Sequence, residues 1–413
     1  MSGAIPRGAC PRLAAPMETG DGLLARLVPA GPMALDAFAA LCAQAGMHGN
    51  GIIEVSARGS LQVRGLTRSS APLFAAAIEA LGLDLCGDVA VIASFLPDDP
   101  SALIDAQSLA RDLRRDIAAA GLALAPKVSV VVDGGGHLHL DAVDADLRLR
   151  AAPGQRVLVS LGGDGDTAAP LGSVAPGSAI ALVLRLLAVI AAHGQEARAR
   201  DVLARSGLDA FRAAAGPIAA PVAPAMRTHA EPIGLHRLNG DACAIGVALA
   251  FGQAQAEDLA ALAHIAQANG ARWIATAPGR ALLLGPIGEL TGFVLATAAD
   301  TLGLIVDARD ARRRVVACAG APACASGLIP ARALAAEIAG VLPPSQDGVA
   351  VHVSGCAKGC AHPAAAPLTV VGTEQGCGIV RGGTARSRPA ACVRVQDLVD
   401  ALMRARLREP VSV

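Results

Sequence analysis

Four cysteines near the carboxyl end of the chain have a spacing that suits a metal centre. Cys318 and Cys324 are separated by five residues, and after a gap of 31 residues Cys356 and Cys360 are separated by three. Four thiolates suit a zinc ion or an iron–sulfur cluster, but zinc sites favour two to four residues between paired cysteines. We therefore predict a [4Fe–4S] cluster on these four cysteines, with zinc or metal-free thiols as the alternatives.

Glycines around these cysteines favour loops that wrap a bulky group, because glycine adopts backbone conformations closed to other residues. They are Gly320, Gly327, Gly355 and Gly359. The other six cysteines have no matching spacing, and we interpret them as core or surface thiols. They are Cys10, Cys42, Cys86, Cys243, Cys377 and Cys392.

Fixed cations are a second feature with chemical potential. The chain has only two lysines, Lys127 and Lys358, and Lys358 lies between two predicted cluster ligands. Arg58 and Arg64 are six residues apart, a spacing that places side chains on the same side of a strand. Arg280 holds nearly the same place as Arg58 in a repeat described below. Arginine binds carboxylates through two parallel hydrogen bonds, so we predict that these five residues bind an anionic substrate. The alternative is solvated surface charge.

Histidines offer a third feature. The segment "GGGHLHLDAVD" places His137, His139 and Asp141 at alternating positions, and His362 follows the last cluster cysteine. Two histidines and one carboxylate are the usual ligands of an oxygen-activating non-haem iron. Polar residues that alternate on an exposed edge strand give the same pattern, so both readings stay open. No residue is assigned a catalytic role.

An internal repeat must position these groups. Residues 20–66 and 240–287 both begin Gly-Asp and continue as strand, helix, strand, tight turn and strand. A unit used twice predicts a pseudo-twofold α/β (α+β) molecule. We expect the chain to divide as follows: residues 1–19, a flexible tail; 20–85, the first half-repeat; 86–206, an α/β domain; 207–232, a linker; 233–300, the second half-repeat; and 301–413, an α/β domain that carries the cluster.

Composition excludes some classes of partner. The net charge of the 413 residues is zero, which argues against nucleic-acid or membrane-surface binding. The most apolar run, residues 179–192, is too short to span a membrane and contains Arg185. The N-terminus lacks the apolar core of a signal peptide, so we expect a cytoplasmic protein with reduced thiols. The glycine-rich "LGGDGD" (161–166) lacks the pattern of a nicotinamide-binding turn, so we expect electrons to arrive from another protein.

The cysteine spacing and the repeat together resemble the sulfite and nitrite reductase superfamily. Within it, four segments are similar to the precorrin-3B synthase branch: "SGCAKGCAHPAAAPLTVVGT", "CAGAPACASG", "PKVSVVVDGGG" and "ARGSLQVRGL". The reductases carry a Lys-x-Lys pair that binds small anions, and here Lys127 is followed by Ser129. The reductases also have an arginine in the segment that matches residues 87–96, where this chain has none. These departures put a six-electron reduction of a small anion in doubt.

The resemblance implies two ferredoxin-like half-repeats and two α/β domains around the cluster. It implies hydroxylation of precorrin-3A at a meso carbon with O2, and closure of a γ-lactone, in aerobic cobalamin biosynthesis. It associates the branch with a mononuclear non-haem iron rather than sirohaem, and with an NADH-dependent reductase as electron donor. Two other functions stay open: a sirohaem-dependent sulfite or nitrite reductase, and a non-catalytic iron–sulfur electron carrier.

Overall fold

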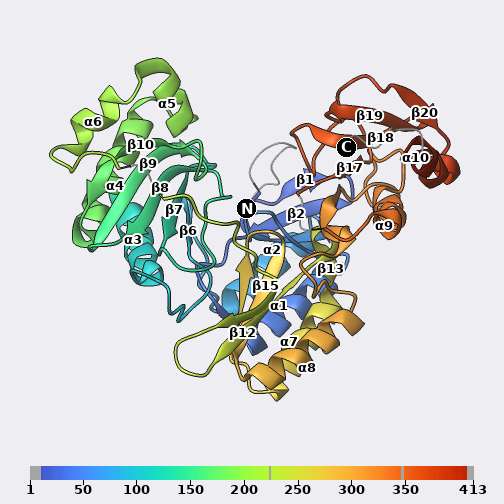
Figure 1. Ribbon diagram of the computed structural model, residues 1–413, viewed down its shortest axis with the longest axis horizontal. Helices are drawn as coiled ribbons and strands as arrows, with labels where there is room; N and C mark the ends of the chain where they lie inside the picture. Colours follow the sequence, from blue (N-terminus) through green and yellow to red (C-terminus); the bar gives the residue numbers. More distant parts are fainter. Residues whose placement is uncertain (1–10, 223–224, 346–347, 407–413) are drawn as a thin grey trace, which may run out of the picture.

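The structure is a computed structural model that describes residues 11–222, 225–345 and 348–406. A central part is built from the two repeats, and one α/β lobe lies on each side of it (Figure 1). Within the described residues the strands form four sheets of five strands each.

Each repeat forms one antiparallel sheet. The first sheet has, in spatial order, β1 (Met17–Thr19), β2 (Gly22–Leu27), β5 (Leu61–Leu66), β4 (Ile52–Val55) and β13 (Gln253–Gln255). The second has β11 (Gly234–Arg237), β12 (Cys243–Ala248), β15 (Ala281–Ile287), β14 (Trp273–Ala277) and β3 (Met33–Ala34). Each repeat therefore lends one short edge strand to the other, since β13 pairs with β4 and β3 pairs with β14. This reciprocal exchange has the pseudo-twofold symmetry predicted from the repeat.

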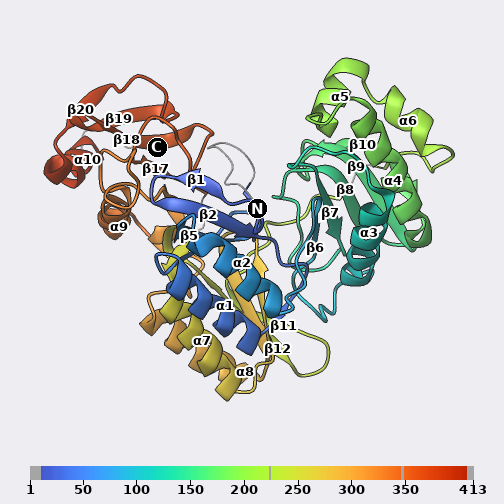
Figure 2. The same ribbon diagram turned by 180° about the vertical axis from the view of Figure 1, so that it is seen from behind.

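Four helices cover one face of the two sheets. Helices α1 (Leu35–His48) and α7 (Ala256–Ala268) pack against each other, with α2 (Ser70–Ala80) and α8 (Glu289–Thr301) beside them (Figure 2). Side chains alternate across a strand, and Val63 and Leu282 point toward these helices into one shared core with Phe38. The two repeats are therefore joined by a continuous apolar interior.

The opposite faces of the two sheets differ in chemistry. In the first sheet, the alternate positions Arg26, Glu54 and Arg64 carry charge. In the second sheet, Ala244 and Leu283 occupy that face and belong to a separate apolar cluster. Among the described residues, this face of the first sheet therefore carries charged side chains where the corresponding face of the second sheet carries apolar ones.

The two α/β lobes also share one topology. The strands of the first are β6 (Ala90–Ala93), β7 (Ser129–Asp133), β8 (Ala145–Ala152), β9 (Arg156–Gly163) and β10 (Ala169–Val174). Those of the second are β16 (Val315–Ala317), β17 (Val351–Ser354), β18 (Ala366–Thr373), β19 (Gly376–Gly383) and β20 (Ala391–Val393). In each lobe the first three strands are parallel and the last two are antiparallel.

Helices complete the lobes. The first lobe has α3 (Ala106–Ala120), α4 (Pro176–Ala192), α5 (Ala199–Ser206) and α6 (Asp209–Ala215), and the second has α9 (Ala331–Val341) and α10 (Leu398–Arg406). Single 3₁₀ turns are η1 (Ala250–Gly252), η2 (Ala311–Arg314) and η3 (Val395–Asp397). Local sequence fixes the ends of α3, because the Asp105 side chain accepts from the Ser108 N–H at 2.9 Å and Gly121 ends the helix in the left-handed conformation.

The structure differs from the expected segment boundaries at two places. Residues 17–19 of the expected tail form β1, which pairs with β2, and α6 lies inside the expected linker. Residues 1–10 of that tail lie outside the described residues. The segment of β1 is too short, and that of α6 too rich in alanine, to show the regular spacing of apolar residues that identifies a strand or a helix.

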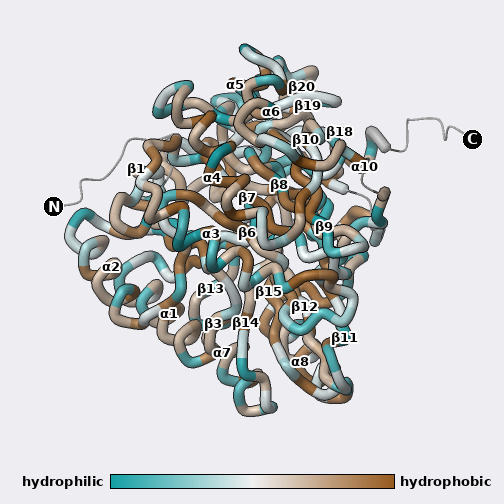
Figure 3. The backbone as a smooth tube through the Cα atoms, turned by 90° about the vertical axis from the view of Figure 1, so that its left-hand side faces the viewer, coloured by the Kyte–Doolittle hydropathy of each residue, from teal (hydrophilic) through white to brown (hydrophobic). Residues whose placement is uncertain are grey.

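Hydrophobic residues run through the strands in the middle of the molecule, and many of the peripheral turns are polar (Figure 3). Over the described parts of the chain, none of the helices combines the length and the apolarity that crossing a membrane requires.

Candidate functional site

The four predicted cluster ligands lie on two loops at one edge of the C-terminal sheet. Cys318 and Cys324 follow β16, and Cys356 and Cys360 follow β17. These strands are parallel neighbours, so both loops begin at carboxyl ends on the same edge of the sheet. Strand pairing thus brings together two cysteine pairs that are far apart in sequence. All four thiols are free.

Close backbone packing explains the glycines of these loops. Gly355 donates its N–H to the sulfur of Cys318 at 3.1 Å. A Cβ added at Gly355 would lie 2.9 Å from the Cα of Gly320, and one at Gly327 would lie 2.6 Å from the Gly320 carbonyl carbon. The two loops therefore approach each other at a distance that larger residues forbid.

The first repeat closes the site from the other side. The carbonyl of Gly20 accepts from the Ala325 N–H at 3.0 Å. A Cβ at Gly20 would lie 2.4 Å from the sulfur of Cys324. The start of the first repeat is thus in direct contact with the loop that carries Cys318 and Cys324. This loop and the loop that carries Cys356 and Cys360 are called the cluster loops below.

The sulfurs act on one another electrostatically. Burial, and after it the neighbouring sulfurs, raise the pKa of the Cys360 thiol, whereas Lys358 lowers it. A zinc ion with Zn–S bonds of about 2.3 Å would hold its sulfurs roughly 3.8 Å apart. No three cysteine sulfurs of the described residues lie within 4.8 Å of one another. The described cysteines therefore do not form the compact group that a zinc ion needs. A [4Fe–4S] cluster on these four cysteines stays a proposal.

A buried guanidinium lies next to the cluster loops. Arg332 is in the first turn of α9, and its Nε and Nη2 atoms are buried without a hydrogen-bond partner among the described residues. The negative charges of Glu54, Cys318 and Asp21 favour its positively charged form. Burial lowers the pKa of Arg332 to about 10, which leaves the group charged at neutral pH.

A cavity of about 690 Å³ lies between the first repeat and the first α/β lobe. Its walls include the end of β2, the turn between β4 and β5, and the starts of β6 and β7. Among the described residues that line it, five are cations and one is a carboxylate: Arg12, Arg26, Arg58, Lys127, Arg198 and Asp88. Asp88, Asp144 and Asp146 form ion pairs with Arg12, Arg58 and Arg198, so part of this positive charge is balanced. The remaining positive charge suits a ligand with carboxylates.

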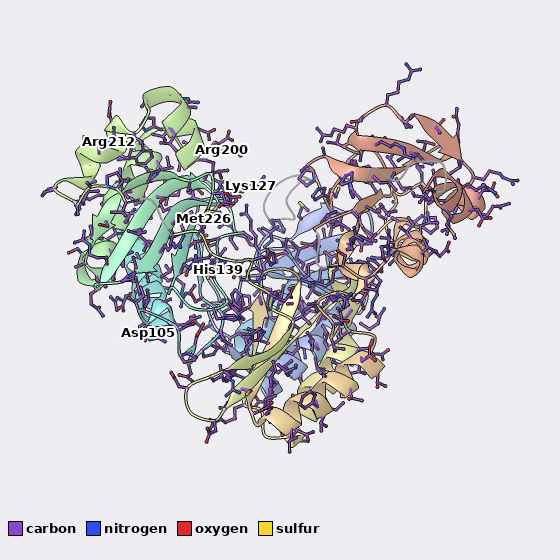
Figure 4. All side chains as sticks on the ribbon, in the orientation of Figure 1. Asp105, Lys127, His139, Arg200, Arg212 and Met226 are labelled. Atoms are coloured by element: carbon purple, nitrogen blue, oxygen red, sulfur yellow. The ribbon has the colours of Figure 1, made fainter. Side chains whose placement is uncertain are left out.

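Two of the predicted substrate-binding residues line this cavity. Arg58 lies in the turn between β4 and β5 and forms an ion pair with Asp144 at 3.1 Å, with both side chains about half exposed. Lys127 lies on the side of the first α/β lobe that faces the rest of the molecule (Figure 4). It has no hydrogen bond or ion pair with any described residue. Ser129 also lines the cavity, and its buried hydroxyl has no described partner.

Two other predicted substrate-binding residues do not line the cavity. Arg64 donates from Nε and Nη2 to the two oxygens of Asp21, at 2.8 and 2.7 Å, and from Nη1 to Glu54 at 3.3 Å. Burial lowers the pKa of Arg280, and the charge of Glu54 partly offsets this. Arg58 is in a turn, so the alternation of a strand does not relate it to Arg64. A role for Arg64 and Arg280 in substrate binding stays a prediction.

The fifth predicted residue, Lys358, is exposed on the cluster loop and donates to the Ser326 hydroxyl at 3.1 Å. Strand β2 and the turn before it connect the cluster loops to the cavity, because Gly20 in that turn contacts Cys324 and Arg26 on β2 lines the cavity. Six residues of strand span roughly 20 Å at about 3.3 Å per residue. The two sites are therefore linked by one short, continuous element.

The predicted His-x-His-x-Asp arrangement is not present. Residues 137–141 form no strand, because the backbone N–H of Leu140 donates to the Asp133 carboxylate at 3.1 Å instead of to a neighbouring strand. His139 lies near Asp141, with 3.4 Å between Nδ1 and Oδ2, and Asp133 completes a compact group of three. The ring of His137 lies away from this group, against that of His236.

This compact group does not fit an iron ion. Arg227 lies within it and donates to Asp141 at 2.9 Å and to Asp133 at 3.2 Å. A guanidinium there supplies the positive charge that a metal would otherwise bring. His139 accepts from the Asp141 backbone N–H at its Nδ1 atom, at 3.3 Å, and contacts the Thr228 carbonyl through Nε2, at 2.6 Å. The group is an ion-pair network, and we derive no oxygen chemistry from it.

His362 lies in a second group, against the buried ring of His352, with ring centroids 5.7 Å apart. No His, Cys, Asp or Glu of the described residues joins them as a third ligand within 4.8 Å. Two imidazoles without a carboxylate do not form the facial triad that was expected for a non-haem iron.

Comparisons with known proteins show the family. No family model matches the chain. A curated precorrin-3B synthase from a Sinorhizobium species is 37% identical over 409 residues, which cover 97% of this chain and 88% of that relative. This chain belongs to the precorrin-3B synthase family. The solved structure of NirA from Mycobacterium tuberculosis matches with a TM-score of 0.73 and 17% identity, over 95% of this chain and 82% of that one. The family member described here therefore has the sulfite/nitrite reductase fold.

Arg227→Ala should destabilise this precorrin-3B synthase family member by about 3–5 kcal/mol at pH 7, because the fully buried Asp133 loses the cation that pairs with it. Asp141 keeps Arg148 and Arg150, at 3.7 and 3.8 Å. Burial alone would raise the pKa of Asp141, but the hydrogen bonds and charge of Arg227 outweigh it and lower that pKa. A lowered carboxyl pKa stabilises the fold above the unfolded-state pKa, and this contribution is lost as the pH falls through the folded-state pKa. Wild type should therefore lose stability below about pH 4, and Arg227→Ala should lose less.

Urea unfolding at pH 7 and at pH 3.5 measures both effects. Arg212→Ala is the matched control, since it removes an exposed arginine that pairs with the exposed Asp209. An Arg227→Ala protein as stable as this control at pH 7 would contradict the prediction.

Sequence reasoning missed Arg332 and Arg227, because both acquire their roles through tertiary contacts. The sequence contains an indication of a special role for Arg332 but not for Arg227. A cation in the first turn of a helix opposes the helix dipole, and such a local conflict often indicates a compensating partner.

Proposed function

We propose that this chain is a precorrin-3B synthase that hydroxylates precorrin-3A at a meso carbon and closes a γ-lactone. One oxygen atom of O2 enters the substrate and the other leaves as water, with two electrons supplied by NADH through a partner reductase. The observation that carries the proposal is the cation-lined cavity of a chain that belongs to this family over 97% of its length.

The charge of the cavity supports a polycarboxylate substrate. Arg58 is paired with the exposed Asp144, and such surface pairs contribute about 0–1 kcal/mol. Exchanging that partner for a substrate carboxylate therefore costs little. Lys127 has no described partner to give up, and the Ser129 hydroxyl can bond a further polar group. Together these groups bind and orient the macrocycle.

The cluster loops supply the second part of the proposal. A [4Fe–4S] cluster on Cys318, Cys324, Cys356 and Cys360 would transfer single electrons when bound. Gly355 orients the Cys318 sulfur through its N–H, and the contact of Gly20 with Cys324 holds the first repeat against this loop. Electrons delivered at the half-exposed loops therefore enter near the polar face of the first sheet.

The test is anaerobic purification followed by iron, sulfide and visible-spectrum analysis, and then incubation with precorrin-3A, a reductant and isotopically heavy O2. We expect iron and sulfide without the red absorption bands of sirohaem, and a product that is heavier by one labelled oxygen atom. Sirohaem bands with reduction of sulfite or nitrite would replace the proposal with the reductase function. A cluster without any turnover of the tetrapyrrole would favour the electron carrier.

A further inference from the structure

Arg332 has hydrogen-bonding capacity that its surroundings leave unused. Two nitrogen atoms of its guanidinium, Nε and Nη2, are buried and have no acceptor among the described residues. A buried donor without a partner costs about 1–3 kcal/mol, and more when it is charged. The guanidinium of Arg332 therefore lacks a hydrogen-bond acceptor among the described residues.

The neighbouring carboxylates are already engaged. Asp21 accepts two hydrogen bonds from Arg64. Glu54 accepts from Arg64 and from the Gln253 side chain. Glu54 also acts electrostatically on Arg332 and Arg280. This group of described side chains therefore has three guanidinium groups (Arg64, Arg280 and Arg332) and two carboxylates (Asp21 and Glu54). Among these five described groups, positive charge exceeds negative charge by one.

Cys318 is a further described group that acts electrostatically on Arg332. Its loop and the start of α9 are packed together, since a Cβ at Gly320 would lie 2.5 Å from the backbone nitrogen of Ala331. A cluster ligated by four thiolates carries net negative charge, which increases on reduction. Its sulfur atoms accept hydrogen bonds, and these bonds together with nearby charge set the reduction potential.

We propose that Arg332 is the buried counter-cation of the cluster, donating from its unpartnered N–H groups to cluster sulfur and stabilising the reduced form. This inference rests on the proposed cluster. Lys358, the other cation of these loops, is exposed and bonded to Ser326. Because water and salt screen an exposed charge, Arg332 has the larger effect of the two.

The test is an anaerobic redox titration of the cluster-loaded protein, followed by the electron paramagnetic resonance signal of the reduced cluster. Arg332→Met removes the charge at similar length, Arg332→Lys keeps the charge without the planar fork, and Lys358→Met is the matched control. In Arg332→Met we expect the reduction equilibrium constant to fall at least tenfold, which is 59 mV toward negative potential for a one-electron couple. Arg332→Lys should shift less, and Lys358→Met less than Arg332→Met.

A fully loaded Arg332→Met protein with the wild-type potential would overturn this inference and leave the proposed function standing. Wild type without iron and sulfide would overturn both. If Arg332→Met does not take up the cluster, urea unfolding of the cluster-free proteins decides. We expect cluster-free Arg332→Met to be at least as stable as cluster-free wild type, because an unpartnered buried charge is gone. Lower stability would show that Arg332 merely supports the fold.

Discussion

Cys356→Ser should yield a folded protein that holds no iron–sulfur cluster and has almost no oxygen-dependent activity. Serine has a similar shape, and the loop is partly exposed, so the fold should tolerate the change. The hydroxyl is a poor substitute for a soft thiolate ligand. Changes around a metal site that spare its ligands already cost about 10–100-fold, and the loss of a ligand should exceed this.

Iron and sulfide analysis after anaerobic purification measures the first effect, and turnover of precorrin-3A measures the second. Cys392→Ser is the matched control, since Cys392 is an exposed free thiol on β20 and should be dispensable. Retention of the full iron and sulfide content by Cys356→Ser would remove this cysteine from the ligand set. Loss of both in the control would point to general instability.

The double variant Arg58→Ala/Lys127→Ala should reduce kcat/KM for precorrin-3A by roughly a hundredfold to ten-thousandfold. A hydrogen bond to a charged group contributes about 1.5–3 kcal/mol, and each 1.4 kcal/mol is a factor of ten. The two residues come from different elements, so their effects should nearly add. Both line the cavity without a buried partner of their own, so the fold should be unaffected.

Steady-state kinetics of the two single variants and the double variant measure this effect. Arg68→Ala is the control, because Arg68 is an exposed arginine that pairs with Glu18 and lies outside the lining of the cavity. Unchanged kinetics in the double variant would place the substrate elsewhere. A loss of cluster in the double variant would instead indicate an indirect effect on the fold.

The repeat and the cysteine loops could be predicted from sequence because each depends on local order. Residues 20–66 and 240–287 repeat the same succession of elements, and parallel pairing of β16 with β17 necessarily brings the two cysteine pairs together. The exchange of β3 and β13 could not be predicted. These strands have two and three residues, too few for a period, and each pairs with a strand of the other repeat, such as Trp273 with Ala34 and Gln253 with Glu54.

The cationic residues show more clearly that spacing in the sequence does not identify which side chains line a binding site. Arg58 and Lys127 line one cavity, and their role in substrate binding stays a prediction. Arg64, in contrast, is bound by two carboxylates that no local pattern reveals. The loop after β7 gives a similar lesson. It occupies in the first lobe the place that a cysteine loop occupies in the second, and there Arg227 is bound by Asp133 and Asp141. A side chain from a distant segment, not the spacing of the histidines, decides the chemistry of that loop.

The strand exchange also sets the order in which the protein is completed during synthesis. The first sheet lacks its edge strand until residue 255 has left the ribosome, and Gly20 has no cysteine loop to contact until residue 325 has followed. Long-range pairings of this kind form late. The nascent chain therefore keeps the charged face of its first sheet open until the last third of the molecule is made, when the loop that carries Cys324 reaches Gly20.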